Sequence, residues 1–237
     1  MQVQLKETIL RAADDSEVRV IVVTGAGRGF CAGADIGDLG QPALMQRHYF
    51  SDMPDADARR GDFEQPLSYP LGGPKPIIAG IKGAIAGVGL CFALFCDIRF
   101  IAADAKVTTA FARRGLIAEY GSAWMLPRLI GPMNAIDLLF TARILLGEEA
   151  AQLGLARLLP AEGFHQAVRH YAAALAEQSS PRSLRIIKEQ IWAGLSQSLA
   201  VASVLADAEM LESLKSADFR EGVRHFVEQR KPTLTGS

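Results

Sequence analysis

The sequence predicts an α/β protein in which strand–turn–helix units precede a helical half. The clearest strand is Val18–Thr24, a run rich in β-branched residues. A second strand, Lys75–Ala79, leads into a glycine-rich turn and then into Leu90–Cys96. Because Leu90–Cys96 is apolar on every face, it is expected to form a fully buried helix. From Ser122 onwards the pattern is helical.

Composition indicates a soluble globular chain without a strong electric field. The chain has 237 residues, 49% of them hydrophobic and 22% charged, and a formal net charge of −1. This length fits one large domain, or one domain with a helical appendage. The balanced charge gives no bulk attraction for nucleic acid or an anionic membrane, so neither is expected as a partner. An anionic ligand would have to be held by local donors.

The cysteines and the N-terminus bear on the compartment. Cys31, Cys91 and Cys96 all lie in apolar or glycine-rich surroundings, which indicates buried thiols in a reducing compartment. No Cys/His spacing resembles a zinc site, and no metal is expected. The start of the chain, MQVQLKETIL, is not typical of a signal peptide, and no apolar run reaches membrane-spanning length. We therefore expect a cytoplasmic protein.

The first third of the chain supplies one strand and a long loop. An amphipathic helix is predicted at Val3–Ala13. Val18–Thr24 is nearly all apolar, so we expect a central strand covered on both faces. Gly25–Gly40 follows with six glycines, which marks a loop whose backbone carries the function. The weakly patterned segment Gln41–Gly73 is expected to contain a helix around Ala43–Phe50 and a binding loop or lid.

Gly87-Val88-Gly89 stand where the buried helix would begin. Free backbone N–H groups and the positive end of the helix dipole converge at such a start, and glycines let another molecule approach the backbone closely. This pattern predicts an oxygen-binding site at the turn; the alternative is that the glycines serve packing alone. Neither glycine loop matches the dinucleotide fingerprint, because Phe30 and Phe92 stand where its third glycine is required.

The second half is predicted to be helical and to carry little chemistry. Ser180 and Asp218 suit helix N-caps. The expected division is a core at 1–131 and a helical region for oligomerisation at 132–237. Helices are predicted at Ser122–Leu129, Pro132–Thr141, Gly147–Leu153, Glu162–Gln178, Pro181–Trp192, Gln197–Leu214 and Asp218–Glu228.

Three segments, in this order and at these separations, resemble the crotonase family, also called the enoyl-CoA hydratase/isomerase superfamily. They are Phe30–Ile36, Gly83–Gly89 and Arg114–Gly131. The resemblance implies a spiral of stacked ββα turns, with C-terminal helices that build a trimer, often a dimer of trimers. It also implies acyl-CoA thioester ligands, with no cofactor besides the coenzyme A that the substrate carries. The family usually begins with two more strands and a basic segment, whereas this sequence starts one helix before its first matched strand, so we expect those strands to be missing from it.

The resemblance also implies roles for particular residues. The backbone N–H groups of Ala34 and Val88 would bind the thioester oxygen, and the backbone around Ala32–Ile36 would hold the adenine end of coenzyme A. Such donors stabilise the charge of an enolate-like oxyanion as it forms. The implied coenzyme A and substrate contacts are Ala32, Gly33, Ala34, Asp35, Ile36, Gly87, Val88, Cys91 and Phe111.

The acid–base residues depart from the family's hydratases. Cys91 and Phe111 occupy the positions of the two hydratase glutamates, and neither moves a proton as a carboxylate does. Glu119 aligns with the acidic residue of several family isomerases and a dehalogenase, so we expect Glu119 to be the single acid–base. Partial burial would raise its pKa. The alternatives are a surface glutamate at 119, and at 91 a small core residue or a thiol nucleophile.

One carboxyl suffices to shift a double bond, because the same group removes a proton and returns it elsewhere. Hydration usually needs a second group to activate water. The sequence therefore favours an enoyl-CoA isomerase. Enoyl-CoA hydratase activity, or another reaction at the α-carbon, is the alternative. An acyl-CoA-binding protein without efficient catalysis is the second alternative.

Overall fold

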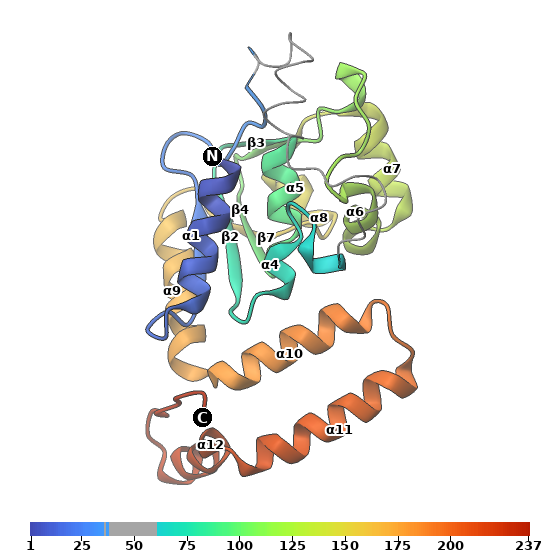
Figure 1. Ribbon diagram of the computed structural model, residues 1–237. Coiled ribbons are helices and arrows are strands. Elements are labelled where there is room, and N and C mark those ends of the chain that lie inside the picture. The colour runs from blue at the N-terminus through green and yellow to red at the C-terminus, as the bar shows by residue number, and fades with distance from the viewer. Residues whose placement is uncertain (36, 38–60) are drawn as a thin grey trace.

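The computed structural model describes residues 1–35, 37 and 61–237 (Figure 1). The helix predicted at Ala43–Phe50 lies outside the described residues. The strands are β1 (Ile21–Thr24), β2 (Ile77–Ile81), β3 (Ala84–Ala86), β4 (Ile98–Ala102), β5 (Lys106–Thr108), β6 (Leu145–Leu146) and β7 (Arg157–Leu159). The helices are α1 (Gln2–Asp14), α4 (Tyr69–Gly72), α5 (Val88–Leu94), α6 (Ser122–Ile130), α7 (Pro132–Thr141), α8 (Gly147–Gln152), α9 (Phe164–Gln178), α10 (Pro181–Gly194), α11 (Leu199–Lys215) and α12 (Ala217–Glu228), with 3₁₀ turns η1 (Asp62–Glu64) and η2 (Ala112–Arg114).

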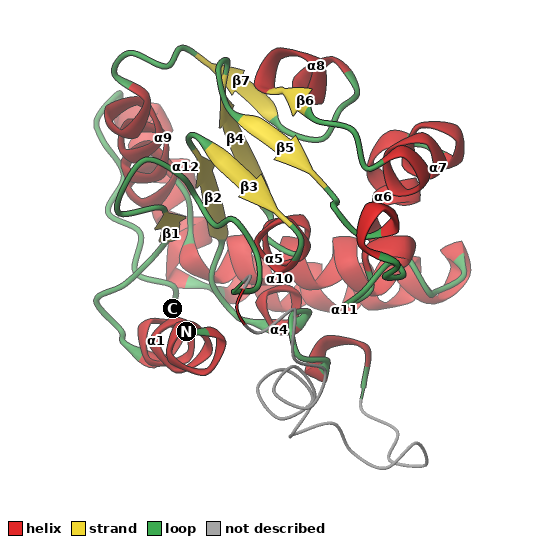
Figure 2. Cartoon of the chain, turned by 90° about the horizontal axis from the view of Figure 1, so that it is seen from above, coloured by secondary structure: helices red, strands yellow, loops and turns green. Residues whose placement is uncertain are grey.

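The strands form two sheets that lie beside each other in Figure 2. The first has the order β1-β2-β4-β7 and is parallel throughout, with Ile21 opposite Ile77 and Ile78 opposite Ile98. The second has the order β3-β5-β6, in which β3 and β5 are parallel and β6 is antiparallel. A parallel bridge joins Cys31 to Ile85 of β3 and extends this second sheet towards the N-terminal loop.

Successive segments of the chain alternate between the two sheets, which produces a spiral. β2 lies in the first sheet, β3 in the second, and α5 follows; β4, β5 and then α6 repeat the order. β1 and the bridge at Cys31 precede them in the same arrangement. The predicted spiral of ββα turns is thus confirmed.

The core is built around β2 and α5. All five residues of β2 and all seven of α5 are buried, as a strand inside a parallel sheet and a helix without a polar face require. The prediction that Val18–Thr24 is a central strand is wrong. In the described sheet β1 is an edge strand that begins at Ile21, with partly exposed residues at Val22 and Val23.

The C-terminal half is helical, as predicted, apart from two short strands. β6 and β7 each pair with a strand of the N-terminal half, so the two sheets draw residues from beyond position 131. Figure 1 shows α10 and α11 side by side below the sheets, with α12 at the end of α11. No helix among the described residues is long and apolar enough to cross a membrane.

Two N-cap predictions have different outcomes. Ser180 caps α10 by accepting the N–H of Ser183. Asp218 does not cap α12; Ser216 does. The Asp218 carboxylate instead accepts the N–H groups of Thr235 and Gly236, so it fastens the C-terminal segment to the helix.

A buried ion pair attaches α10 to the sheets. Lys188 Nζ lies 2.8 Å from Asp97 Oδ2 and donates to the carbonyls of Pro70 and Lys75. The same Asp97 oxygen accepts the N–H of Ile77 at 2.8 Å, at the start of β2. Asp97 thus also accepts a hydrogen bond from the backbone. Both ionic groups are largely buried, so the attraction between them is needed to offset the free-energy cost of removing the two charges from water.

We expect the Lys188→Met variant to lose about 3–5 kcal/mol of the free energy of unfolding, because Asp97 would be left buried and unpaired. Urea unfolding at a fixed protomer concentration measures this. Lys215→Met is the matched control, since the pair of Lys215 with Glu212 is exposed; it should change the free energy by less than about 0.5 kcal/mol. Equal effects of the two substitutions would contradict the assigned role.

Candidate active site

The start of α5 presents unpaired backbone amides, as predicted. The first hydrogen bond of the helix runs from the Cys91 N–H to the Gly87 carbonyl, at 2.9 Å. The amides of Val88, Gly89 and Leu90 precede that bond and have no acceptor within the helix. Gly87 itself has φ +51° and ψ −123°, a conformation that favours glycine. These N–H groups lie at the positive end of the helix dipole, which favours a negatively charged ligand atom there.

A partly buried arginine, Arg99, occupies the opposite end of α5. Arg99 Nη1 donates to the carbonyls of Leu94 and Cys96, and its Nε donates to the Leu155 carbonyl. A cation here is favourable because the C-terminal carbonyls of the helix carry partial negative charge. Burial lowers the pKa of Arg99 from its ordinary value. The sequence analysis did not find this residue, because no local pattern marks it.

The Cys31–Ala34 loop lies directly against the start of α5. The Ala86 N–H donates to the Cys31 carbonyl at 2.9 Å. A Cβ at Gly33, whose φ is +101°, would lie 3.2 Å from the Ala86 carbonyl oxygen, and one at Gly87 would lie 3.9 Å from the Gly33 Cα. The two glycines are therefore neighbours in space. Ala34 follows Gly33 and Val88 follows Gly87, so the backbone enters each of these two residues from a neighbouring point in space.

The approach is closest at Gly89. A Cβ there would lie 2.5 Å from Cys31 Cβ and 2.6 Å from the Cys31 carbonyl oxygen. Packing thus requires glycine at this position, while Gly33 and Gly87 lie next to each other at the start of α5.

Two further residues predicted to contact coenzyme A, Ala32 and Asp35, lie on the same loop. Ala32 and Asp35 are exposed. Asp35 Oδ1 accepts the N–H of Gly37 at 2.8 Å, so it holds a turn. Ile36 lies outside the described residues.

Glu119 lies on the loop between η2 and α6, half-buried. Its carbonyl accepts the Cys91 thiol, with 3.6 Å between sulfur and oxygen, and the N–H of Ser122 at 2.9 Å. Since Cys91 belongs to α5, these contacts fix the loop next to that helix. Burial raises the pKa of the Glu119 carboxyl from its ordinary value of 4.5.

Cys91 and Phe111 are both buried in the core. Burial raises the pKa of the Cys91 thiol to about 12; the Ser122 hydroxyl beside it lowers the pKa, and the Glu119 carboxylate raises it further. The thiol is therefore protonated at neutral pH and is no nucleophile. Its surroundings fit the small core residue that was one of the two alternatives.

Glu119 lines a cavity of about 710 Å³. The cavity lies among η1 with α4, the loop 116–121, the start of α6 and the end of α10. Cys91 and Phe111 are not among its described lining residues. These are Asp62, Phe63, Gln65, Pro66, Leu67, Ser68, Leu71, Phe95, Leu116, Ile117, Ala118, Glu119, Tyr120, Gly121, Trp124, Trp192, Leu195 and Ser196.

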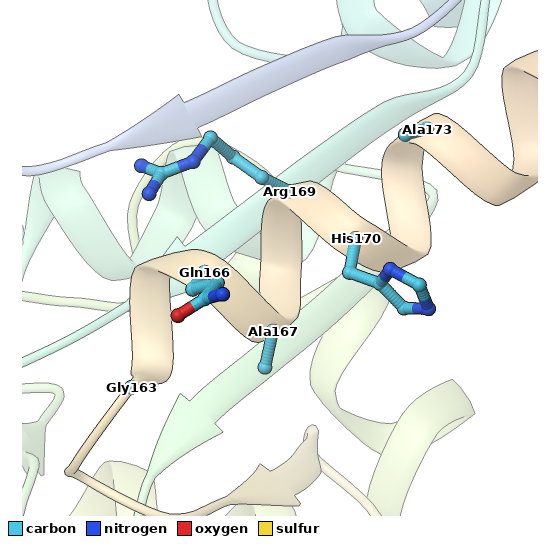
Figure 3. Close-up of a pocket in the computed structure, with 6 residues that line it drawn as sticks. All are labelled: Gly163, Gln166, Ala167, Arg169, His170 and Ala173. Carbon is cyan, nitrogen blue, oxygen red and sulfur yellow. The ribbon is translucent and has the colours of Figure 1, made fainter.

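A second depression, of about 600 Å³, lies along α9 (Figure 3). It is lined from Gly163 to Ala173, and the side chains of Gln166, Arg169 and His170 project from the helix in different directions. None of its residues belongs to the motifs, and Figure 1 places α9 across the sheet from α6. A single helix without convergent groups is a poor active site, so the cavity at Glu119 is the better candidate.

The whole chain, residues 1–237, matches the family model described as enoyl-CoA hydratase/isomerase. The chain belongs to this family. A probable enoyl-CoA hydratase from Rhodobacter capsulatus is 36% identical over 221 residues, which cover 93% of this chain and 82% of that protein. The 1,2-epoxyphenylacetyl-CoA isomerase of Escherichia coli is 33% identical over 238 residues, which cover all of this chain and 88% of that protein.

Solved structures of the family agree with the fold. A probable enoyl-CoA hydratase/isomerase from Mycobacterium abscessus superposes with a TM-score of 0.86 at 32% identity, and covers 99% of this chain and 88% of that one. The motifs that pointed to the enoyl-CoA hydratase/isomerase family were therefore correctly interpreted.

The sequence analysis missed the cavity wall contributed by α10. Trp192 lies four residues after Lys188, a spacing that puts both on one helix face. A lysine and a tryptophan on one face of an amphipathic helix were the available signal. Their partner, Asp97, is 95 residues away from Trp192 in the sequence, and no local pattern joins the two.

We expect Gly89→Ala to force the Cys31 loop away from α5 and to destabilise the fold by about 1–3 kcal/mol, the usual cost of overpacking. Gly27→Ala is the control, because a Cβ at Gly27 meets nothing within 4 Å. Thermal unfolding of both variants measures the difference. Unchanged stability of Gly89→Ala would show that the loop yields without cost.

Proposed function

We propose that the protein shifts a double bond in unsaturated acyl-CoA thioesters, with Glu119 as the single acid–base. The observation that carries the proposal is the position of Glu119. Its loop is hydrogen-bonded to Cys91 of α5, its side chain lines the cavity, and burial raises the pKa of its carboxyl. A raised pKa brings a carboxyl closer to the range in which it both accepts and donates a proton.

In the proposed mechanism, the N–H groups of Ala34 and Val88 hold the thioester oxygen. Glu119 removes a proton from the α- or γ-carbon, the electrons spread onto the thioester oxygen as a dienolate, and the same carboxyl returns the proton to the other carbon. The atoms balance without a further reactant. In well-studied oxyanion holes one donor contributes roughly 2.7–4 kcal/mol to transition-state stabilisation.

Isomerisation is preferred because one carboxyl is enough for it, whereas Cys91 and Phe111 supply no second proton carrier. Hydration of 2-enoyl-CoA is the alternative, and the relatives carry names of both kinds: a probable enoyl-CoA hydratase in Rhodobacter capsulatus and an isomerase of 1,2-epoxyphenylacetyl-CoA in Escherichia coli. We propose that the backbone of Ala32–Ile36 holds the adenine end of coenzyme A and that no other cofactor takes part. We also propose a cytoplasmic location, because the three cysteines are free, as is usual in a reducing compartment.

We also propose that the chain assembles into a trimer or hexamer through its C-terminal half. Large apolar side chains are exposed along α7, α11 and α12, more than a single small domain needs to leave uncovered. Among the most exposed are Met133, Phe140, Leu199, Val204, Phe226 and Val227.

Glu119→Gln keeps the size and hydrogen bonding of the side chain but removes the base, so kcat should fall by about 10²–10⁴-fold. Affinity for the thioester should change little. In the parent enzyme kcat/KM should fall as the pH drops through the raised pKa of Glu119, above 4.5, because the protonated carboxyl is no base. This acid limb should be missing in the variant.

Cys91→Ala is the control for the Glu119 variant and should keep exchange of the substrate α-proton with solvent deuterium within a few-fold. Loss of exchange in Cys91→Ala, with exchange retained in Glu119→Gln, would overturn the assignment. Thioester binding without turnover by either protein would favour the acyl-CoA-binding alternative.

Separate assays with 3-enoyl-CoA and 2-enoyl-CoA distinguish the two reactions. We expect 3-enoyl-CoA to be converted to the 2-enoyl isomer, because the proton removed by Glu119 returns at the γ-carbon. Formation of 3-hydroxyacyl-CoA from 2-enoyl-CoA, with no conversion of 3-enoyl-CoA, would replace the isomerase proposal with the hydratase.

Sedimentation velocity at micromolar protomer concentration tests the assembly. The expected species is a trimer or hexamer, since burying the apolar faces of α11 and α12 is favourable. A stable monomer at that concentration would refute it.

A further inference from the structure

The cavity at Glu119 has an unusually aromatic wall. Five of its eighteen described lining residues are aromatic, whereas aromatic residues make up 7% of the chain. Both tryptophans of the protein are among them. The five are Phe63, Phe95, Tyr120, Trp124 and Trp192.

Trp192 is held by a network of buried polar groups. Its indole Nε1–H donates to Asp97 Oδ1 at 3.0 Å. The other carboxylate oxygen of Asp97 is bound by Lys188, one helical turn before Trp192, and by the N–H of Ile77 in β2. With the polar edge of the indole fixed on Asp97, the rest of the ring is available to the cavity as a rigid apolar wall.

Trp124, on the first turn of α6, is also held in place. The guanidinium of Arg128 lies over its ring, 3.8 Å from the ring centroid, and donates to the Trp124 carbonyl. Rings whose positions are already fixed lose little entropy when a ligand binds, and they pair best with another ring in offset or edge-on geometry. A flexible chain loses rotamer freedom against the same wall.

The polar residues that line the cavity further limit the class of acyl group that it can bind. The described lining residues include no Lys, Arg or His, so a second negative charge on the acyl group would have no partner there. The Ser68 hydroxyl is engaged internally, since it donates to the Asp62 carbonyl and accepts the Gln65 N–H. The described lining has two carboxyl groups, those of Asp62 and Glu119. Asp62 is exposed, so Glu119 is the carboxyl that a bound apolar group contacts.

We propose that this cavity takes an aromatic acyl group carried on coenzyme A, and that Trp192, positioned by Asp97 and Lys188, is the residue that selects it. The inference rests on the proposed acyl-CoA function and adds the class of acyl group.

Calorimetric titration with two unreactive thioesters tests the inference. Phenylacetyl-CoA and octanoyl-CoA carry the same number of acyl carbons and differ in the ring. The parent protein should bind phenylacetyl-CoA about tenfold more tightly, the size of one or two aromatic contacts. Trp192→Leu should lose about that factor for phenylacetyl-CoA and change the octanoyl-CoA affinity less than about twofold.

Two further variants keep the test decisive. Trp192→Phe retains a ring without the N–H, and should keep part of the preference if Trp192→Leu does not fold. Glu189→Gln is the control. Glu189 lies on the same helix in an exposed pair with Arg185, so this substitution should leave the ratio of the two affinities unchanged.

The outcomes separate the two proposals. Equal binding of both thioesters by the parent protein, or an equal loss of both in Trp192→Leu, overturns the inference and leaves the acyl-CoA function standing. Failure to bind either thioester or free coenzyme A overturns the acyl-CoA function, and the inference with it.

Discussion

In the contact between the Cys31–Ala34 loop and the start of α5, Cys31 packs against the backbone of Gly89 and leaves no room for a side chain there. Two turns of the spiral that are more than fifty residues apart in the sequence meet there. Because interiors are close-packed, such a contact fixes both partners to within a fraction of an ångström. The backbone at Ala34 and Val88, next to this contact, is therefore held firmly as well. The Glu119 carbonyl is hydrogen-bonded to Cys91 of the same helix.

Asp97 provides a second fixed point, on the far side of α5. Its carboxylate connects the first strand residue of β2, the lysine of α10 and the indole of Trp192. The C-terminal helix is therefore part of the cavity wall. A chain shortened before α10 would lose α10, α11 and α12, and with α10 one wall of the cavity.

Much of the fold was predictable from the sequence, because its signals are local. The buried helix, the glycine turns and the helices after Ser122 follow from periodicity and composition, and the ordered motifs identified the family. The edge position of β1 was not predictable, since a run of apolar residues does not tell which strands lie beside it. The role of Asp218 and the aromatic wall depend on partners distant in the chain, which no local pattern encodes.

The proposed division of labour between backbone and side chains has a consequence for evolution. A point mutation exchanges a side chain but leaves the amide of every residue except proline in place. The amides proposed as donors at positions 34 and 88 are thus insulated from most genetic change, whereas Glu119 and Trp192 would act through their side chains and change with a single substitution. If the proposed roles hold, a lineage built on this scaffold can acquire a new reaction or a new acyl group one residue at a time, without rebuilding the proposed oxyanion site.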